Sequence, residues 1–435
     1  MTDLPARPLW QGRAIALIGI VLVAFSLRSA VAALSPILAE VETDFAVPVV
    51  IVGLIGAAPP VCFAALGILT PALERRFGLE RLAVAAMVVA AAAMVARAFA
   101  GDAVVLLIAT AVLFAAIGVG NVVLPPLIKV YFPDRTGFMT GLYSSLLAIA
   151  AFVPPLVAVP VADAAGWRFS LGLWAVFALA AIVPWAVQLV VDARGGAPSR
   201  QAGGPAAAEG SVGVVEGVGV EGSVDVDEPA PGVLGRLPRI PLAWALALTF
   251  AISSASVYVC FAWLPEVLVE MAGVSHAEAG ALLSLFGAMG LPWSILVPLA
   301  ITRWHRVGIL YAIALVAGVA GAAGMVLAPT AATVLWVALL GVPQGLFPAV
   351  LVLIQRRART REGAVALSSF SQSVGYAVAA IFPLAFAVLH AVTGGWEAAI
   401  VLLGALFLLA IPAGIIVTRT RTIEEEWEKR HGAWR

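Results

Sequence analysis

Twelve long apolar segments dominate this sequence, and they decide what the chain can fold into. Each is at least 20 residues long, the length that an α-helix needs to cross a hydrocarbon layer about 30 Å thick. Inside a bilayer every backbone amide and carbonyl has to be paired within the chain, so we expect each segment to be a helix. The expected spans are 14–36, 48–73, 81–100, 103–131, 137–161, 168–190, 241–264, 277–301, 306–328, 331–355, 363–389 and 397–418.

The composition agrees with a polytopic membrane protein. Of the 435 residues, 62% are hydrophobic and 11% are charged, whereas soluble domains carry about 25% charged residues. We therefore predict an all-α membrane protein with twelve transmembrane helices. The first segment is expected to be a retained span, because it is too long for the apolar core of a signal peptide.

The stretch between the sixth and seventh spans differs in composition from the rest. Residues 192–240 are rich in Gly, Ala, Val and acidic residues and show neither a helical nor a strand period, which is typical of a flexible tether. A regulatory role is the alternative. The chain is thus expected to consist of an N-terminal six-helix half (1–191), a cytoplasmic linker (192–240), a C-terminal six-helix half (241–418) and a cytoplasmic tail (419–435).

The basic residues are distributed unevenly between the two ends of the spans. If the N-terminus is cytoplasmic, 22 of the 25 Lys and Arg lie on the cytoplasmic side. The exceptions are Arg28, within the first span, and Arg97 and Arg168, near the outer ends. This bias predicts that both termini are cytoplasmic. It also accounts for the basic clusters, so no nucleic-acid partner is expected.

Arg28 is the most unusual residue of the first span. A guanidinium stays protonated in proteins, and an arginine at the centre of a bilayer costs about 2.5 to 3.5 kcal/mol on insertion scales. Such a charge is expected to face a water-filled cavity between helices. Our hypothesis is that Arg28 binds an anion. The alternative is a structural arginine that donates to backbone carbonyls or to Ser and Asn side chains.

The two halves carry matching residues at corresponding positions. Five residues of the second span recur 227 positions later in the eighth, where Gly53, Ile68, Leu69, Pro71 and Arg76 become Gly280, Ile295, Leu296, Pro298 and Arg303. The fourth span reads Gly118-x-x-Asn121-x-x-x-Pro125 and the tenth reads Gly341-x-x-Gln344-x-x-x-Pro348. A six-helix repeat is typical of transporters whose site lies at the midplane between the halves.

Polar residues inside the spans are the candidates for solute contacts. Asn121 and Gln344 occupy matching positions, and an amide both donates and accepts; bonds between neighbouring helices are the alternative. Tyr143, next to two serines, and Gln372, between Ser371 and Tyr376, mark two further polar stripes. Tyr258, Phe261 and Trp263 are candidates for an aromatic wall, with Trp263 at an outer gate, and interfacial packing is the alternative.

The sequence contains no pattern typical of an enzyme. The four histidines have no metal-ligand spacing, no span carries a carboxylate at mid-depth, and no nucleophile and base are brought together by the expected depth of the residues. We therefore expect no catalytic residues, no metal and no cofactor. The function is expected to come from the polar residues that line a central cavity.

The segments that carry these residues resemble a known family. They are SLRSAVAALSPIL (26–38), TPALERRFGLERL (70–82), GNVVLPPLIKVYFPDRTGFMTGLYSS (120–145), GWRFSLGLW (166–174) and GVPQGLFPAVLVLI (341–354). Together they resemble the major facilitator superfamily and, within it, the cyanate and nitroimidazole transporter group (CynX/NimT type). That group usually has NLRPA in its first helix, where this chain has SLRSA, so Ser26 and Ser29 replace an Asn and a Pro.

The resemblance implies a fold, a site and a function. It implies a major facilitator fold that works by alternating access, with an inner gate formed by Glu74, Arg75 and Arg76 in PALERRFG, although Pro71 replaces the usual first glycine. The implied function is secondary transport of a small anionic or polar solute, cyanate-like or another small organic anion, by a monomer in a bacterial inner membrane. A proton would be co-transported or an anion exchanged. The alternative is efflux of nitroaromatic or drug-like compounds.

Overall fold

A computed structural model of the chain describes residues 13–193, 231–304, 307–419, 421–432 and 434. In this part of the chain every regular element is a helix, and twelve helices are long and apolar enough to cross a membrane. Each of the twelve predicted spans corresponds to one of them, so the predicted fold class is confirmed. Most of the predicted linker, residues 194–230, lies outside the described residues.

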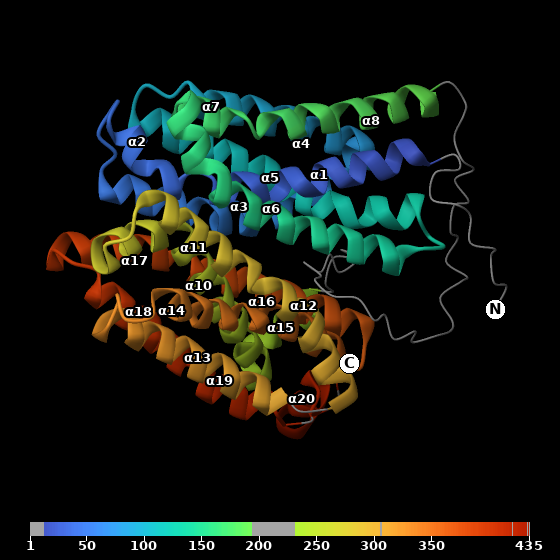
Figure 1. Ribbon diagram of the computed structural model, residues 1–435. Helices are drawn as coiled ribbons and strands as arrows, with labels where there is room; N and C mark the ends of the chain where they lie inside the picture. Colours follow the sequence, from blue (N-terminus) through green and yellow to red (C-terminus); the bar gives the residue numbers. More distant parts are fainter. Residues whose placement is uncertain (1–12, 194–230, 305–306, 420, 433, 435) are drawn as a thin grey trace.

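The two six-helix halves lie against each other, one above the other in Figure 1. The first half consists of α1 (Ala14–Ala32), η1 (Ser35–Ile37), α2 (Leu38–Glu42), α3 (Val49–Phe77), α4 (Leu79–Ala98), α5 (Ala103–Tyr131), α6 (Thr136–Ala165), α7 (Trp167–Gly172) and α8 (Ala175–Ala193). The second half consists of α9 (Pro231–Leu234), η2 (Leu237–Arg239), α10 (Pro241–Ala272), α11 (His276–Ala288), α12 (Gly290–Leu299), η3 (Ala300–Trp304), α13 (Val307–Leu327), α14 (Thr333–Gly341), η4 (Val342–Gly345), α15 (Leu346–Arg356), α16 (Arg361–Ala379), α17 (Ile381–Thr393), α18 (Glu397–Leu408), α19 (Ala410–Val417) and α20 (Ile423–His431).

The helices end where local chemistry satisfies their unpaired backbone groups. Asp102 caps α5 by accepting hydrogen bonds from the amides of Val104 and Val105, at 2.8 and 2.9 Å. Ser275 and Glu278 form a capping box at the start of α11. Just before it, Gly273 ends α10 at a φ of 68°, a left-handed conformation that glycine adopts without strain.

The helix α10 extends further than the sequence predicts. The prediction ended the seventh span at residue 264, before Pro265, whereas the helix continues to Ala272 with Pro265 inside it. A proline removes a single backbone donor, and a long helix packed on its neighbours tolerates that loss. Glu266 and Glu270, which follow the predicted end of this span, are therefore on the helix.

The two ends of the helix bundle carry different ion pairs. At one end Arg13 pairs with Asp134, and this hydrogen bond raises the pKa of the guanidinium. At the opposite end Asp44 pairs with Arg168 and accepts a hydrogen bond from the Trp167 indole at 3.0 Å, and both interactions lower the pKa of the carboxyl group. We call these ends the Arg13 face and the Asp44 face.

The halves approach each other most closely near the Asp44 face. A Cβ added at Gly53 of α3 would lie 2.9 Å from the Cβ of Ala387 in α17, and one added at Gly280 of α11 would lie 2.7 Å from the carbonyl oxygen of Pro155 in α6. Only glycine allows backbones to pack this tightly. Toward the Arg13 face, α3 instead exposes Ile68 (68%). The two halves are therefore closed against each other at the Asp44 face.

Candidate functional site

A cavity of about 180 Å³ lies between the two halves. The first half contributes α1 and α6 to its wall, and the second half contributes α10, α11, α12, η4, α15 and α16. Its polar lining residues are Arg28, Ser253, Ser254, Tyr258, Ser294, Gln344 and Tyr376. We call it the central cavity.

Arg28 brings the positive charge to this cavity. It lies 14 residues after Ala14 and 14 residues before Glu42, that is, midway between the start of α1 and the end of α2. Its side chain is partly buried and lies close enough to the hydroxyl groups of Tyr258 and Tyr376 for its charge to act on both. The structure thus connects Arg28, on the first half, to two tyrosines on the second.

Three of the chain's five tyrosines surround Arg28. Tyr143 of α6 is 1% exposed, and it is close enough to Arg28 to interact with its charge. The Tyr143 hydroxyl has no hydrogen-bond partner among the described residues, and the residue does not line the central cavity. The ring of Tyr376 packs edge-on against Phe250 with centroids 4.8 Å apart, which fixes its orientation.

Gln344 reaches the central cavity because its helix is interrupted there. It lies in η4, the short 3-10 turn between α14 and α15. Its side-chain amide donates to the carbonyl oxygen of Phe286 at 2.7 Å, and its backbone carbonyl accepts from the Ser253 hydroxyl at 3.4 Å. The adjacent break between α11 and α12, at Met289, places Gly290 and Ser294 in the same wall. Interrupted helices beside a central cavity are typical of transporter sites.

Two predicted contacts lie away from the central cavity. Asn121, the repeat partner of Gln344, does not line it, and the Asn121 side-chain oxygen is buried without a partner. The continuous helix α5 packs against α3 and α4 and has no turn comparable to η4. Gln372 donates to the Ser368 hydroxyl at 2.8 Å, one turn back along α16, and does not line the cavity either.

The predicted gating residues lie at opposite ends of the bundle. Glu74, Arg75 and Arg76 occupy the last turn of α3 at the Arg13 face, where both arginines are exposed. Trp263 is 1% exposed, lies toward the Asp44 face, and donates to the carbonyl oxygen of Pro383 at 2.9 Å. Its ring packs against Trp396, with centroids 5.2 Å apart.

Sequence reasoning missed several residues of the cavity wall. Ser253, Ser254 and Ser294 line it, yet single serines in an apolar run give no signal of their own, because they also pair with their own helix backbone. Tyr376 was noted only as a neighbour of Gln372, although it faces the cavity and Gln372 does not. The two are four residues apart on α16, and sequence spacing alone does not say which member of a stripe faces the opening.

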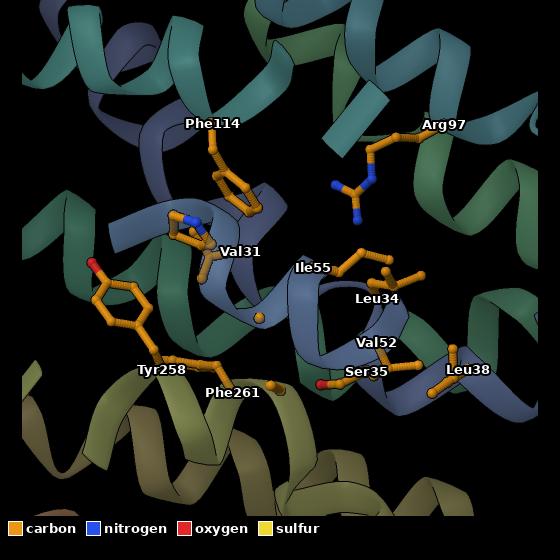
Figure 2. Close-up of a pocket in the computed structure, with 13 residues that line it drawn as sticks. Val31, Leu34, Ser35, Leu38, Val52, Ile55, Arg97, Phe114, Tyr258 and Phe261 are labelled. Atoms are coloured by element: carbon orange, nitrogen blue, oxygen red, sulfur yellow. The ribbon is translucent and has the colours of Figure 1, made fainter. Parts of the chain in front are cut away.

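A second, smaller cavity of about 30 Å³ lies on the Asp44 side of the first. Figure 2 shows its lining, with the guanidinium of Arg97 pointing toward Ile55 and Leu34. Val31, Tyr258 and Phe261 line both cavities and therefore separate them. We call these three residues the septum, and the smaller space the Arg97 cavity.

The chemistry of the central cavity suits binding rather than catalysis. A guanidinium, phenol and serine hydroxyls and an amide can recognise a small anion or a polar solute by hydrogen bonds. Aromatic and aliphatic side chains, including Phe261, Phe347 and Val257, complete the wall. Among the described residues no group of His, Cys, Asp or Glu is arranged to hold a metal ion.

Comparison with known proteins gives one family. Residues 18–383 match the Major Facilitator Superfamily. An uncharacterized transporter of Bacillus subtilis, YycB, is 30% identical over 95% of this chain and 96% of its own length. The 2-nitroimidazole transporter of Escherichia coli is 29% identical, covering 95% and 98%, and the cyanate transport protein CynX of the same organism is 24% identical, covering 87% and 91%.

The same fold occurs in solved structures. A bacterial homologue of the human lysosomal transporter Spinster, in an inward-facing and unoccupied conformation, superposes with a TM-score of 0.70 at 15% sequence identity. The alignment covers 95% of this chain and 98% of that one. At this level of identity the likeness concerns the fold alone.

Proposed function

The chain belongs to the Major Facilitator Superfamily, as a multi-pass membrane transporter of the cyanate and nitroimidazole type, and on this premise we propose what it carries. We propose that its solute is a small anion, cyanate-like or another small organic anion, and that Arg28 binds it. The observation that carries this proposal is the position of Arg28 in the wall of the central cavity, between the halves and beside Tyr258.

The environment of Arg28 supports an anion site over a purely structural role. A structural arginine would be enclosed by backbone carbonyls, whereas this one lines a cavity whose other polar groups are hydroxyls and an amide. Hydroxyls donate readily to an anion. An anion bound at Arg28 would therefore find further donors in Ser253, Ser254 and Tyr376.

Alternating access follows from the arrangement of the halves. In this structure the septum and the close packing of α3 on α17 and of α6 on α11 separate the central cavity from the Asp44 face. Rocking of one half against the other would separate these contacts and expose Arg28 to that side. We propose that Glu74, Arg75 and Arg76 gate the Arg13 face and that Trp263 takes part in closing the Asp44 face.

The direction in which the anion moves relative to the membrane potential determines how its transport has to be coupled. We propose that the Arg13 face is cytoplasmic, that the membrane is the bacterial inner membrane, and that the protein works as a monomer. Moving an anion inward against the membrane potential costs about 2.3 kcal/mol per 100 mV. Import would then require a co-transported proton or an exchanged anion, whereas efflux would run with the potential.

The second candidate function is transport of neutral nitroaromatic compounds. It is favoured by the aromatic part of the cavity wall, where Tyr258, Phe261 and Phe347 offer stacking surfaces. The similarity of the chain to a 2-nitroimidazole transporter also supports this candidate. In this case Arg28 would bind the electron-rich nitro group.

Uptake by purified protein in proteoliposomes tests the proposal. Arg28→Gln is expected to reduce uptake of labelled cyanate by about tenfold or more, since a hydrogen bond to a charged group is worth about 1.5 to 3 kcal/mol. Arg28→Lys is expected to recover little of it, because an ammonium lacks the planar fork of the guanidinium. Arg168→Gln, which removes an exposed arginine of the Asp44 face, is the control and should transport normally.

Two results would decide against an anion site at Arg28. The first is normal cyanate uptake by Arg28→Gln. The second is a wild-type protein that takes up 2-nitroimidazole but no cyanate, which would establish the nitroaromatic candidate instead.

A further inference from the structure

Arg97 is a buried arginine that lines the smaller cavity, between the central cavity and the Asp44 face. It lies at the end of α4 and is 3% exposed, although the sequence suggested only a charge near the outer ends of the helices. Among the described residues its hydrogen bond runs from Nη1 to the carbonyl oxygen of Ala30, at 3.2 Å. Its Nε is buried without a partner, and no carboxylate of the described residues pairs with it.

A second polar group that lines the Arg97 cavity also lacks a hydrogen-bond partner. The hydroxyl of Ser35 is buried without a partner and lines the same space. The volume of about 30 Å³ suffices for one or two waters, or for an ion of similar size. Because buried donors without acceptors are costly, two of them beside one cavity favour the binding of an acceptor there.

A helix-capping role accounts for only part of this arrangement. Ala30 lies in the last turn of α1, where carbonyl groups lack helical partners, so the bond from Arg97 does stabilise that end. A neutral donor would serve the same purpose without the several kcal/mol that burying an ion costs. The positive charge itself is unexplained by the cap.

The septum places the two arginines in series. Arg28 lines the cavity on one side of Val31, Tyr258 and Phe261, and Arg97 lines the cavity on the other. Tyr258, which lines the central cavity together with Arg28, is also part of the wall of the Arg97 cavity. An anion that left Arg28 toward the Asp44 face would meet Arg97 next.

We propose that Arg97 and Ser35 form a second subsite for a small monovalent anion, on the Asp44 side of the septum. The subsite receives the anion when the septum opens and delivers it to Arg28. This inference rests on the proposed anion transport for its biological meaning, but its physical content, an anion-attracting cavity at Arg97, is testable without any transport measurement.

Reaction rates of a cysteine at position 35 measure the charge of this cavity directly. In a Cys62→Ala, Cys260→Ala background, Ser35→Cys is treated with anionic sulfonatoethyl and cationic trimethylammonioethyl methanethiosulfonates. The ratio of the anionic to the cationic rate is expected to fall by about tenfold on Arg97→Gln, because a nearby unit charge acts strongly in a low-dielectric cavity. Arg97→Lys should keep the ratio, and Arg168→Gln, an exposed arginine at the same face, should leave it unchanged.

A protection experiment covers the case in which Arg97→Gln fails to fold. With Arg97 in place, sodium thiocyanate, a linear monovalent anion that does not react with thiols, is expected to slow modification of Ser35→Cys by a neutral methanethiosulfonate in a saturable way, and neutral acetamide is not. The proposal is overturned if the ratio of the anionic to the cationic rate is the same in Arg97→Gln and the parent, or if thiocyanate gives no protection. If Arg28→Gln loses cyanate uptake but keeps the parent's ratio of anionic to cationic rates, the two sites act separately. If Arg97→Gln has the same ratio as the parent while uptake still depends on Arg28, the subsite proposal fails and the proposed function stands alone.

Discussion

Glu424 is a single buried carboxylate that fastens the last helix to the second half. It is 1% exposed, and its Oε1 accepts hydrogen bonds from the backbone amides of Arg359 and Thr360, at 3.0 and 3.1 Å, and from the Thr360 hydroxyl at 3.1 Å. The amide of Ile423 donates to the carbonyl oxygen of Arg357 at 2.9 Å. The predicted tail is therefore an ordered helix, α20, docked on the loop between α15 and α16.

Replacing this carboxylate should be far more costly than replacing an exposed one nearby. Glu424→Ala leaves two partly buried amides without their acceptor, so we expect it to lower the free energy of unfolding by about 2 to 4 kcal/mol. Glu428→Ala, which removes an exposed partner of Arg359, should change it little. Thermal unfolding of both variants in detergent measures the difference, and equal midpoints would contradict this account.

At the scale of single residues, the sequence identified the charged residue of the central cavity more reliably than the other residues that line it. Arg28 stood out because a cation in an apolar run is costly wherever it lies, and the structure places it beside the central cavity with Tyr258 and Gln344. Asn121 and Gln372 had similar sequence signals and lie elsewhere. Which side of a helix faces a cavity depends on its rotation against its neighbours, which a fully apolar helix does not encode. The binding roles of all these residues stay predictions.

At the scale of helices, small residues set how the halves close. Gly280 of α11 lies against the carbonyl oxygen of Pro155 in α6, and Gly53 of α3 lies against Ala387 in α17. Both glycines came from the internal repeat, where they occupy corresponding positions of the second and eighth spans. The repeat therefore marks a contact that each half makes with the other near the Asp44 face.

An added methyl group at this contact should favour the state that is open at the Asp44 face. Gly280→Ala brings a Cβ to 2.7 Å from a backbone oxygen, and overpacking of this kind costs about 1 to 3 kcal/mol. Gly67→Ala, where nothing lies within 4 Å, is the matched control on α3. Spin labels at Val50 of α3 and Val392 of α17, both exposed, report the separation of the halves.

The distance distribution between these labels decides the outcome. Gly280→Ala should increase the population with long distances about fivefold or more, while Gly67→Ala should match the parent protein. A shift of the same size in both variants, or none in Gly280→Ala, would show that this packing does not hold the Asp44 face closed.

Helix boundaries followed local chemistry, but interruptions within helices did not. The cap at Asp102 and the glycine at Gly273 agree with simple rules, whereas η4 and the break at Met289 arise inside continuous apolar runs. Packing of Gly341 against Met289, where an added Cβ would lie 2.7 Å from the Cβ of Met289, brings the two breaks together. Such a distortion depends on the neighbouring helix, so the sequence of one helix does not predict it.

At the scale of the whole molecule, charge predicts the orientation in the membrane. The excess of Lys and Arg falls on the Arg13 face, and this is the basis for proposing that this face is cytoplasmic. The loop between α13 and α14, with the exposed Thr330, lies at the opposite face, and the exposed Lys429 of α20 lies at the Arg13 face.

Labelling of intact cells with a membrane-impermeant maleimide tests this orientation. In the Cys62→Ala, Cys260→Ala background, Thr330→Cys should react in intact cells, and Lys429→Cys should react only after permeabilisation. Labelling of Lys429→Cys in intact cells would place the tail outside and contradict the proposed orientation.

The sequence by itself determined the twelve helices and the presence of one charged residue, Arg28, within the first of them. These follow from segment length, apolar composition and the cost of a charge in hydrocarbon, all of which act locally along the chain. The tertiary structure decided which polar residues meet at the cavity, that the septum divides it from Arg97, and that Arg97 is buried. Those features depend on how apolar helices rotate, break and pack between the halves, and in an environment as apolar as their own side chains the hydropathy pattern leaves that packing unspecified.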